Sequence, residues 1–139
     1  MSMSPRRTES VATLAIIGAV LASIVTTGVV LVAQSSRRDF DVVARKYSFT
    51  VAGNNSSEIH VTQNDLVHVN FSTEDIPHSF TIEDRPNSHY RIMRRAEPGK
   101  PVSFDFRADT PGRFRFYCSL TIDEKCKDMQ GTLIVDPKN

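Results

Sequence analysis

Two cysteines and a methionine lie close together near the C-terminal end of this sequence. Cys118, Cys126 and Met129 all belong to the stretch FYCSLTIDEKCKDMQGTLIV, so two thiols and a thioether fall within twelve residues. Soft sulfur ligands of this kind favour copper, Cu(I) above all. Two thiols can also form a disulfide in an oxidising compartment, or remain free and inert. The residues alone leave a metal site, a disulfide and two unrelated thiols open.

The length and charge of the chain limit its function. Its 139 residues allow about one ordinary domain. The 17 basic side chains nearly balance the 16 acidic ones, so no strongly basic surface for nucleic acid is expected. The sequence offers no Ser-His-Asp set, paired carboxylates or phosphate-binding loop. An enzyme acting alone is therefore the weakest interpretation.

An uncharged run from Ser10 to Ser36 precedes the rest of the chain. Its core, VATLAIIGAVLASIVTTGVVLVAQ, covers residues 11–34. A helix of this length, rising ~1.5 Å per residue, crosses a ~30 Å hydrocarbon layer. The apolar core of a cleaved signal peptide is shorter, usually about 7–15 residues. We therefore predict a single transmembrane anchor at 11–34.

The anchor predicts how the chain is divided and where it lies. Two arginines flank the run on each side, so the count of positive charges gives no orientation. The short tail at 1–10 is the easier end to leave in the cytoplasm. We expect a cytoplasmic (inner) membrane protein whose soluble domain, 45–139, faces the periplasm or the outside. Residues 35–44 are interpreted as a linker.

The soluble part alternates apolar and polar residues with a period of two. The pattern predicts strands in KYSFTVA, DLVHVNFS, PVSFDFRA, GRFRFYCS and GTLIV, separated by turn formers such as AGNNSS, EPGK and DTPG. Short alternating strands at intervals of about 8–12 residues are typical of an all-β sandwich or barrel. Cys118 shares its face with Phe114 and Phe116, so it is predicted to point into the sandwich at one end.

Several segments, in the same order, resemble one known family. IPHSFTI, ADTPGRFRFYC and MQGTLIV are similar to segments of the cupredoxins, and most closely of the copper-bearing domain of cytochrome c oxidase subunit II. The resemblance covers about residues 46–135. It implies an all-β, Greek-key β-sandwich (cupredoxin-like) preceded by one N-terminal transmembrane helix. It also implies that His78, which begins HSFTI, is a metal ligand.

The loop that holds copper in that family is altered here. The family pattern is C-x-x-x-C-x-x-x-H-x-x-M, and counting from Cys118 its second cysteine falls on Ile122 and its histidine on Cys126. The spacing to Met129 is kept. The resemblance therefore implies one copper ion, rather than two, among His78, Cys118, Cys126 and Met129. A Cys118–Cys126 disulfide and two free thiols remain the alternatives.

The resemblance implies a membrane-anchored, extracytoplasmic cupredoxin that binds copper and passes single electrons in a respiratory chain. Such a protein would be a subunit or relative of a haem–copper oxidase, partnered by other respiratory-chain subunits or a small electron carrier. One alternative is a copper carrier or assembly factor. The other is a metal-free, structural module resembling subunit II, closed by the Cys118–Cys126 disulfide.

Overall fold

The computed structural model describes residues 35–83 and 90–139. The predicted tail and anchor at residues 1–34 lie outside the described residues. Among the residues that are described, no helix is long and apolar enough to cross a membrane.

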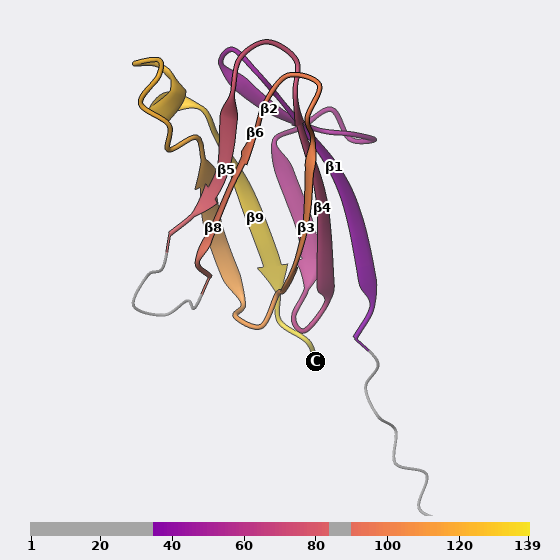
Figure 1. Ribbon diagram of the computed structural model, residues 1–139. Coiled ribbons are helices and arrows are strands. Elements are labelled where there is room, and N and C mark those ends of the chain that lie inside the picture. Colours follow the sequence, from indigo (N-terminus) through magenta and orange to yellow (C-terminus); the bar gives the residue numbers. More distant parts are fainter. Residues whose placement is uncertain (1–34, 84–89) are drawn as a thin grey trace, which may run out of the picture. The chain divides into compact units, whose positions relative to one another are not determined.

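The described chain folds into two β-sheets (Figure 1). One sheet has four strands in the order β2-β1-β4-β7, and the other has five in the order β3-β9-β8-β5-β6. Strands distant in sequence are neighbours in both sheets, as in Greek-key sandwiches. The strands are β1 (Arg37–Arg45), β2 (Ser48–Val51), β3 (Glu58–Thr62), β4 (Leu66–Thr73), β5 (His78–Ile82), β6 (Ile92–Ala96), β7 (Val102–Arg107), β8 (Gly112–Tyr117) and β9 (Gln130–Asp136).

Alternation of apolar and polar residues accounts for the strands and for the face that each one buries. In β4, Val67, Val69 and Phe71 are buried, whereas His68 points away from them and its Nδ1 atom lies 2.8 Å from the Asp105 carboxylate. The same pattern holds in β8, where Phe114 and Phe116 are buried between exposed arginines. The strands predicted at these positions, and at β2, β7 and β9, are confirmed.

The N-terminal segment of the described chain differs from its prediction. The expected linker, 35–44, is wrong, because Arg37–Arg45 forms the nine-residue strand β1. It pairs in parallel with β4 from Arg37 opposite Leu66 to Ala44 opposite Thr73. Four of the five charged residues of RRDFDVVAR, at positions 37–39 and 41, hide the alternation of a strand whose Val42 and Ala44 are completely buried. Burial of these apolar side chains against β4 fixes the segment in the sheet.

Aromatic side chains fill the space between the sheets. The Phe80 ring stacks on Phe116 with centroids 4.6 Å apart, and it contacts Phe104 at 5.4 Å. Phe49 meets Phe116 edge to face at 5.2 Å. Gly131 lies so close to the Phe116 ring that a β-carbon there would collide with it. The core therefore depends on close packing of large rings.

The two ends of the sandwich differ. Residues 118–129 form a loop that projects at the end opposite the C-terminus (Figure 1). The loop includes a short 3₁₀ helix, η1 (Cys126–Asp128). The start of β5 reaches the same end, because β5 pairs with β8 through Thr81 and Tyr117. This end therefore brings His78 to the two cysteines.

Candidate metal centre

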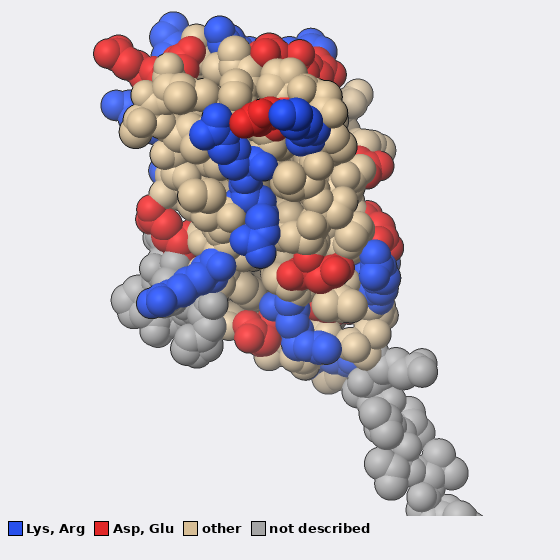
Figure 2. Space-filling model, viewed as in Figure 1, with Lys and Arg blue, Asp and Glu red and all other residues tan. Residues whose placement is uncertain are grey.

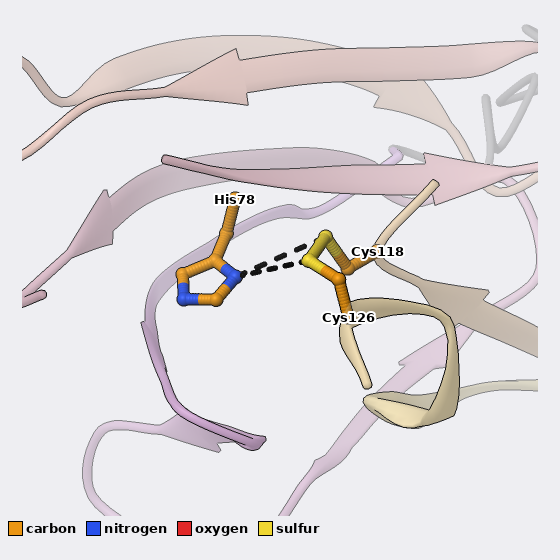
Figure 3. A group of neighbouring side chains, drawn as sticks. All are labelled: His78, Cys118 and Cys126. Carbon is orange, nitrogen blue, oxygen red and sulfur yellow. Dashed lines mark hydrogen bonds between the residues drawn. A yellow bond between two sulfur atoms is a disulfide. The ribbon is translucent and has the colours of Figure 1, made fainter. Parts of the chain in front are cut away.

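Three segments converge at the end of the sandwich that carries the 118–129 loop. His78 is the first residue of β5, Cys118 directly follows β8, and Cys126 begins η1. All three are completely buried. Their possible ligand atoms lie within 4.8 Å of one another. Figure 3 shows the imidazole of His78 facing the sulfur atoms of both cysteines.

The two cysteines form a disulfide in this structure. Cys118 and Cys126 are bonded through their sulfur atoms, with a Cα–Cα distance of 5.4 Å. Of the states left open by the sequence, the structure therefore has the disulfide. A disulfide sulfur carries no thiolate charge, so in this state the pair is a poor metal ligand.

His78 places one ring nitrogen against the disulfide. Its Nδ1 atom lies 3.4 Å from the Cys126 Sγ atom and 3.8 Å from the Cys118 Sγ atom. Its Nε2 atom lies 2.9 Å from the Asp75 carboxylate. The two ring nitrogens therefore have different partners, one sulfur and one oxygen.

Asp75 fixes the orientation and the tautomer of His78. Burial by itself would raise the pKa of Asp75, but hydrogen bonds from the backbone N–H groups of Lys46 and Ile76, together with His78, lower that pKa to about 2. The backbone donors lie 2.6 and 2.7 Å from the carboxylate. The ionised carboxylate accepts a hydrogen bond from Nε2–H, which in a neutral imidazole leaves a lone pair on Nδ1.

In the neutral imidazole, the Nδ1 lone pair would be a buried acceptor that faces two sulfur atoms without protons. Neither sulfur of a disulfide can donate a hydrogen bond to Nδ1. Histidines that bind metals characteristically donate their other ring N–H to a carboxylate, as His78 does to Asp75. The residues therefore fit a soft metal ion once the disulfide is reduced to two thiols, and do not fit one before.

Asp75 was missed by the sequence analysis. A signal for it exists, since it stands three residues before His78 in DIPH. That spacing is common in turns, so it does not by itself distinguish a metal-site partner from a solvated loop residue. Its role depends on the backbone donor of Lys46, which comes from 29 residues away.

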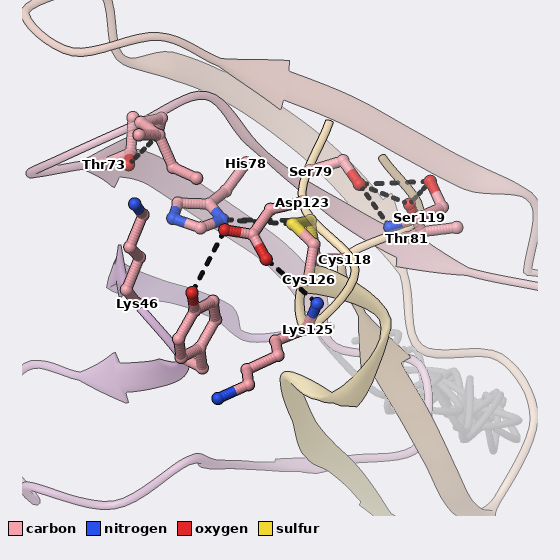
Figure 4. The surroundings of a disulfide bond; sticks show 12 residues. Lys46, Thr73, His78, Ser79, Thr81, Cys118, Ser119, Asp123, Lys125 and Cys126 are labelled. Atoms are coloured by element: carbon pink, nitrogen blue, oxygen red, sulfur yellow. Dashed lines mark hydrogen bonds between the residues drawn. A yellow bond between two sulfur atoms is a disulfide. The ribbon is translucent and has the colours of Figure 1, made fainter. Parts of the chain in front are cut away.

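The turn between β1 and β2 also holds the loop that carries Cys126. The Tyr47 hydroxyl donates to Asp123 Oδ2 at 3.1 Å, and this hydrogen bond is the main reason why the pKa of Tyr47 is raised. The backbone N–H of Lys125 donates to the same carboxylate, and that of Cys126 donates to the Asp123 carbonyl. Figure 4 shows Asp123 and Lys125 in these positions beside the disulfide. Asp123 is thus engaged in holding the loop.

A partly buried cluster of hydroxyl groups fixes the chain on the other side of Cys118. The side chains of Ser79, Thr81 and Ser119 lie within 2.9–3.2 Å of one another (Figure 4). The backbone N–H of Ser119 also donates to Ser79 Oγ at 2.8 Å. Cys118 is therefore held firmly against β5.

Met129, the fourth predicted ligand, is completely buried next to the cysteines. Its backbone N–H donates to the Cys126 carbonyl, and its carbonyl accepts from the Cys118 N–H. Ile122, which stands where the related loop has a cysteine, is 56% exposed. The structure thus gathers His78, Cys118 and Cys126, with the backbone of Met129 linking the two cysteines.

No protein-family model matches the sequence. Solved structures match its fold. A haem–copper terminal oxidase dimer has a TM-score of 0.60 at 22% identity, over 76% of this chain and 68% of that chain. Auracyanin A, a "blue" copper protein from Chloroflexus aurantiacus, has a TM-score of 0.55 at 15% identity, over 73% and 100%.

A third match is subunit II of cytochrome c oxidase, in a mixed disulfide with a thioredoxin-like protein. It has a TM-score of 0.55 at 18% identity, over 72% of this chain and 82% of that chain. At these identities the likeness concerns the fold. The described domain has the cupredoxin fold, which blue copper proteins share with subunit II of cytochrome c oxidase.

Proposed function

We propose that this protein is an extracytoplasmic cupredoxin that binds one copper ion and passes single electrons in a respiratory chain. The observation that carries the proposal is the placement of His78. Its Nδ1 atom faces both cysteine sulfurs in a buried site, while its Nε2 atom is held by Asp75. Histidines that bind metals direct one ring nitrogen at the other ligands and give the other to a carboxylate, and His78 has this arrangement.

In the reduced protein, copper would be bound by the thiolates of Cys118 and Cys126, the imidazole of His78 and the thioether of Met129. Two thiolates favour Cu(I), while the imidazole helps to stabilise the cupric state. Bound there, copper supplies one-electron redox chemistry. His78 on β5 and Cys118 directly after β8 are held by rigid strands, which limits reorganisation of the site when the charge changes.

The disulfide in the structure is the oxidised, metal-free form in this proposal. Two electrons must reach Cys118 and Cys126 before copper can bind. An oxidising compartment, which the predicted anchor at residues 11–34 would place around the domain, favours the disulfide. The thioredoxin-like partner of subunit II in a related structure supports a dithiol protein as the source of those electrons.

The fold shared with a haem–copper oxidase supports respiratory-chain partners. The domain would be a subunit of such a complex or would exchange electrons with a small carrier. Single-pass anchoring in the cytoplasmic membrane by residues 11–34 remains part of this proposal.

The disulfide itself favours a second candidate, a metal-free structural module. In that case the Cys118–Cys126 bond would be permanent and would close the loop of the domain. A copper carrier, in contrast, would bind Cu(I) through the same residues but would exchange it readily with chelators.

Metal analysis of the full-length chain tests these functions. The chain is reduced, loaded with copper and freed of excess, and copper per chain and visible absorption are measured. We expect about one copper per chain and a thiolate-to-copper band in the oxidised form. Cys118→Ser should abolish binding, whereas Met129→Leu should have a mild effect. Copper-free protein after complete reduction would leave the structural module as the function.

The Cys126→His variant offers a sharper test. It removes the disulfide and gives the site two imidazoles, one thiolate and one thioether, the ligand set of blue-copper proteins. We expect an intense blue colour when this variant binds copper. A colourless variant would mean that position 126 does not face the metal, and the mononuclear site would be wrong.

A further inference from the structure

Strand β6 forms one open edge of the five-stranded sheet. It stands last in the order β3-β9-β8-β5-β6, and β5 is its one partner among the described strands. The Met93 carbonyl accepts a hydrogen bond from the Arg94 guanidinium at 3.0 Å, so this acceptor is open to a donor outside β5. Main-chain groups along such an edge can pair with a further strand.

Basic side chains gather along this edge. The segment 91–100 carries four of them, on Arg91, Arg94, Arg95 and Lys100, and a single acidic one, on Glu97. The Glu97 carboxylate lies 3.5 Å from the Arg95 guanidinium and 3.6 Å from the Lys100 ammonium group. Figure 2 shows a band of basic side chains across this face of the molecule, in the same view as Figure 1. The edge therefore carries a surplus of positive charge.

Two surface hollows flank β6, one beside each of its ends. The hollow at the start of the strand measures about 330 Å³ and has Ile92 and Met93 in its wall. The hollow at the other end measures about 370 Å³ and is lined in part by Arg95 and Lys100. Alternate side chains of an added strand point to one face of the sheet. An apolar side chain would suit the first hollow, and an acidic one the second.

A second copy of this chain is a poor occupant for the edge. Pairing of two β6 strands would bring their arginines together, and like charges destabilise cross-strand pairs. Charged side chains on an edge strand therefore oppose self-association. The same charges attract a strand that carries carboxylates.

We propose that β6 is a docking edge for an extended, acidic segment of a partner protein, which pairs with it as an additional strand. Main-chain hydrogen bonds to the edge would supply affinity, and carboxylates facing Arg95 and Lys100 would supply selectivity. None of these side chains is a candidate copper ligand. The docking edge is therefore independent of copper and goes beyond the proposed function.

Binding of a designed peptide to the full-length chain, in a nonionic detergent, tests the inference. The probe is a fluorescent peptide of about nine residues, the length of a strand, that alternates glutamate with valine. We expect saturable binding by fluorescence anisotropy. Two matched peptides should bind at least about tenfold more weakly, one with lysine in place of glutamate and one with proline in place of the central valine. Equal binding of either matched peptide would overturn the inference.

Charge reversal on the chain locates the peptide. Arg95→Glu should weaken binding of the acidic peptide by at least about fivefold. Arg113→Glu on β8 is the matched control, because Arg113 is also exposed on this sheet and also pairs with a glutamate, Glu58. This control should leave the affinity unchanged. Equal weakening by the two variants would mean attraction to overall charge, and the docking edge would be wrong.

Hydrogen exchange in the wild-type chain gives a measurement that does not depend on the stability of the variants. We expect the peptide to slow amide exchange in β6 and to leave β3, the other edge strand of the same sheet, unchanged. Protection of β3 instead, or binding without protection of β6, would contradict the proposal.

The same measurement distinguishes other occupants of the edge. Dimerisation of the peptide-free chain with protected β6 amides would make a second copy the occupant. Protection of β6 by micelles containing phosphatidylserine, but not by the peptide, would make an anionic lipid surface the occupant. Either result would overturn the proposal of an acidic partner segment.

Discussion

The aromatic core and the candidate metal centre are equally buried but are held together by different forces. Phe71, Phe80 and Phe116 have no exposed surface, and neither do His78 and the two cysteines. The rings pack against one another without directional bonds. The site, in contrast, depends on a covalent bond and on hydrogen bonds to Asp75 and Asp123.

This difference separates what maintains the fold from what decides the chemistry. A packed core tolerates many sequences, provided that volume and apolar character are kept. A metal site tolerates few, because it needs particular atoms with particular protonation states. The cupredoxin fold can therefore persist while the ligand loop changes, as at Ile122 and Cys126.

The largest effect is expected in the core. Phe80→Ala removes a ring that contacts three other phenylalanines, Phe71, Phe104 and Phe116. The lost packing and the cavity should lower the free energy of unfolding by about 3–5 kcal/mol, measured by chemical denaturation. The matched control is Met93→Ala on the neighbouring strand, because Met93 is 56% exposed. This variant should lower the free energy of unfolding only slightly. Similar costs for the two variants would mean that the core does not depend on this ring.

Reduction of the disulfide should have the next largest effect. The bond joins residues separated by eight positions, and closing a loop of this size constrains the unfolded chain by about 2–3 kcal/mol. We expect the fully reduced, metal-free protein to lose about that much stability in denaturant titrations. Adding Cu(I) to the reduced chain should restore stability, since a ligand bound only by the folded state raises it. If copper leaves the stability of the reduced chain unchanged, this end of the molecule is structural only.

Asp75→Asn should have a smaller effect that depends on pH. The pKa of Asp75 lies at about 2 in the folded domain, below its ordinary value of 3.8, so the ionised carboxylate stabilises the fold at neutral pH. This contribution is lost as the pH falls from about 4 to about 2. We expect the free energy of unfolding of the variant to be lower by about 1–2 kcal/mol at pH 7, which is less than the full pKa shift would give because Asp75 is partly exposed. The stability of the variant should also depend less on pH in the acid range.

The same variant should bind copper about 10- to 100-fold more weakly, because His78 loses the partner that orients it. Competition with a Cu(I) chelator measures this. Asp41→Asn, on β1 away from the site, is a matched control that should leave the copper affinity as it is. Unchanged affinity in Asp75→Asn would show that His78 is positioned by packing alone.

The smallest effect is expected from loss of the Tyr47–Asp123 hydrogen bond that holds the 118–129 loop. Tyr47→Phe removes the hydrogen bond to Asp123 and should lower the free energy of unfolding by about 0.5–1 kcal/mol. Dithiothreitol should reduce the disulfide of this variant faster than that of the wild type. Tyr90→Phe removes the same group elsewhere, where the Tyr90 hydroxyl bonds to the Thr110 backbone. That control should leave the reduction rate unchanged. Equal rates in all three proteins would show that the Tyr47 hydroxyl does not restrain the loop.

The local alternation of apolar and polar residues predicted strands β2, β4, β7, β8 and β9, but not β1, β3, β5 and β6. The strands with regular alternation, β4 and β8 among them, were predicted because each apolar side chain is buried by its own position in the strand. Strand β1 was not, since only Val42 and Ala44 mark its buried face among charged neighbours. Its place in the sheet comes from parallel pairing with β4, a contact between segments distant in sequence.

The sequence by itself determined that Cys118 points inward and that His78 and the altered cysteine loop belong to one fold. Both conclusions rest on local alternation and on the order of recognisable segments. Only the tertiary structure decided that Cys118 and Cys126 are bonded, that Asp75 holds His78, and that His78 faces both sulfur atoms. The approach of His78 to the two cysteines depends on how strands β5 and β8 and the following loop meet in space. Contacts between residues 48 and 40 positions apart leave no periodic trace in a single sequence.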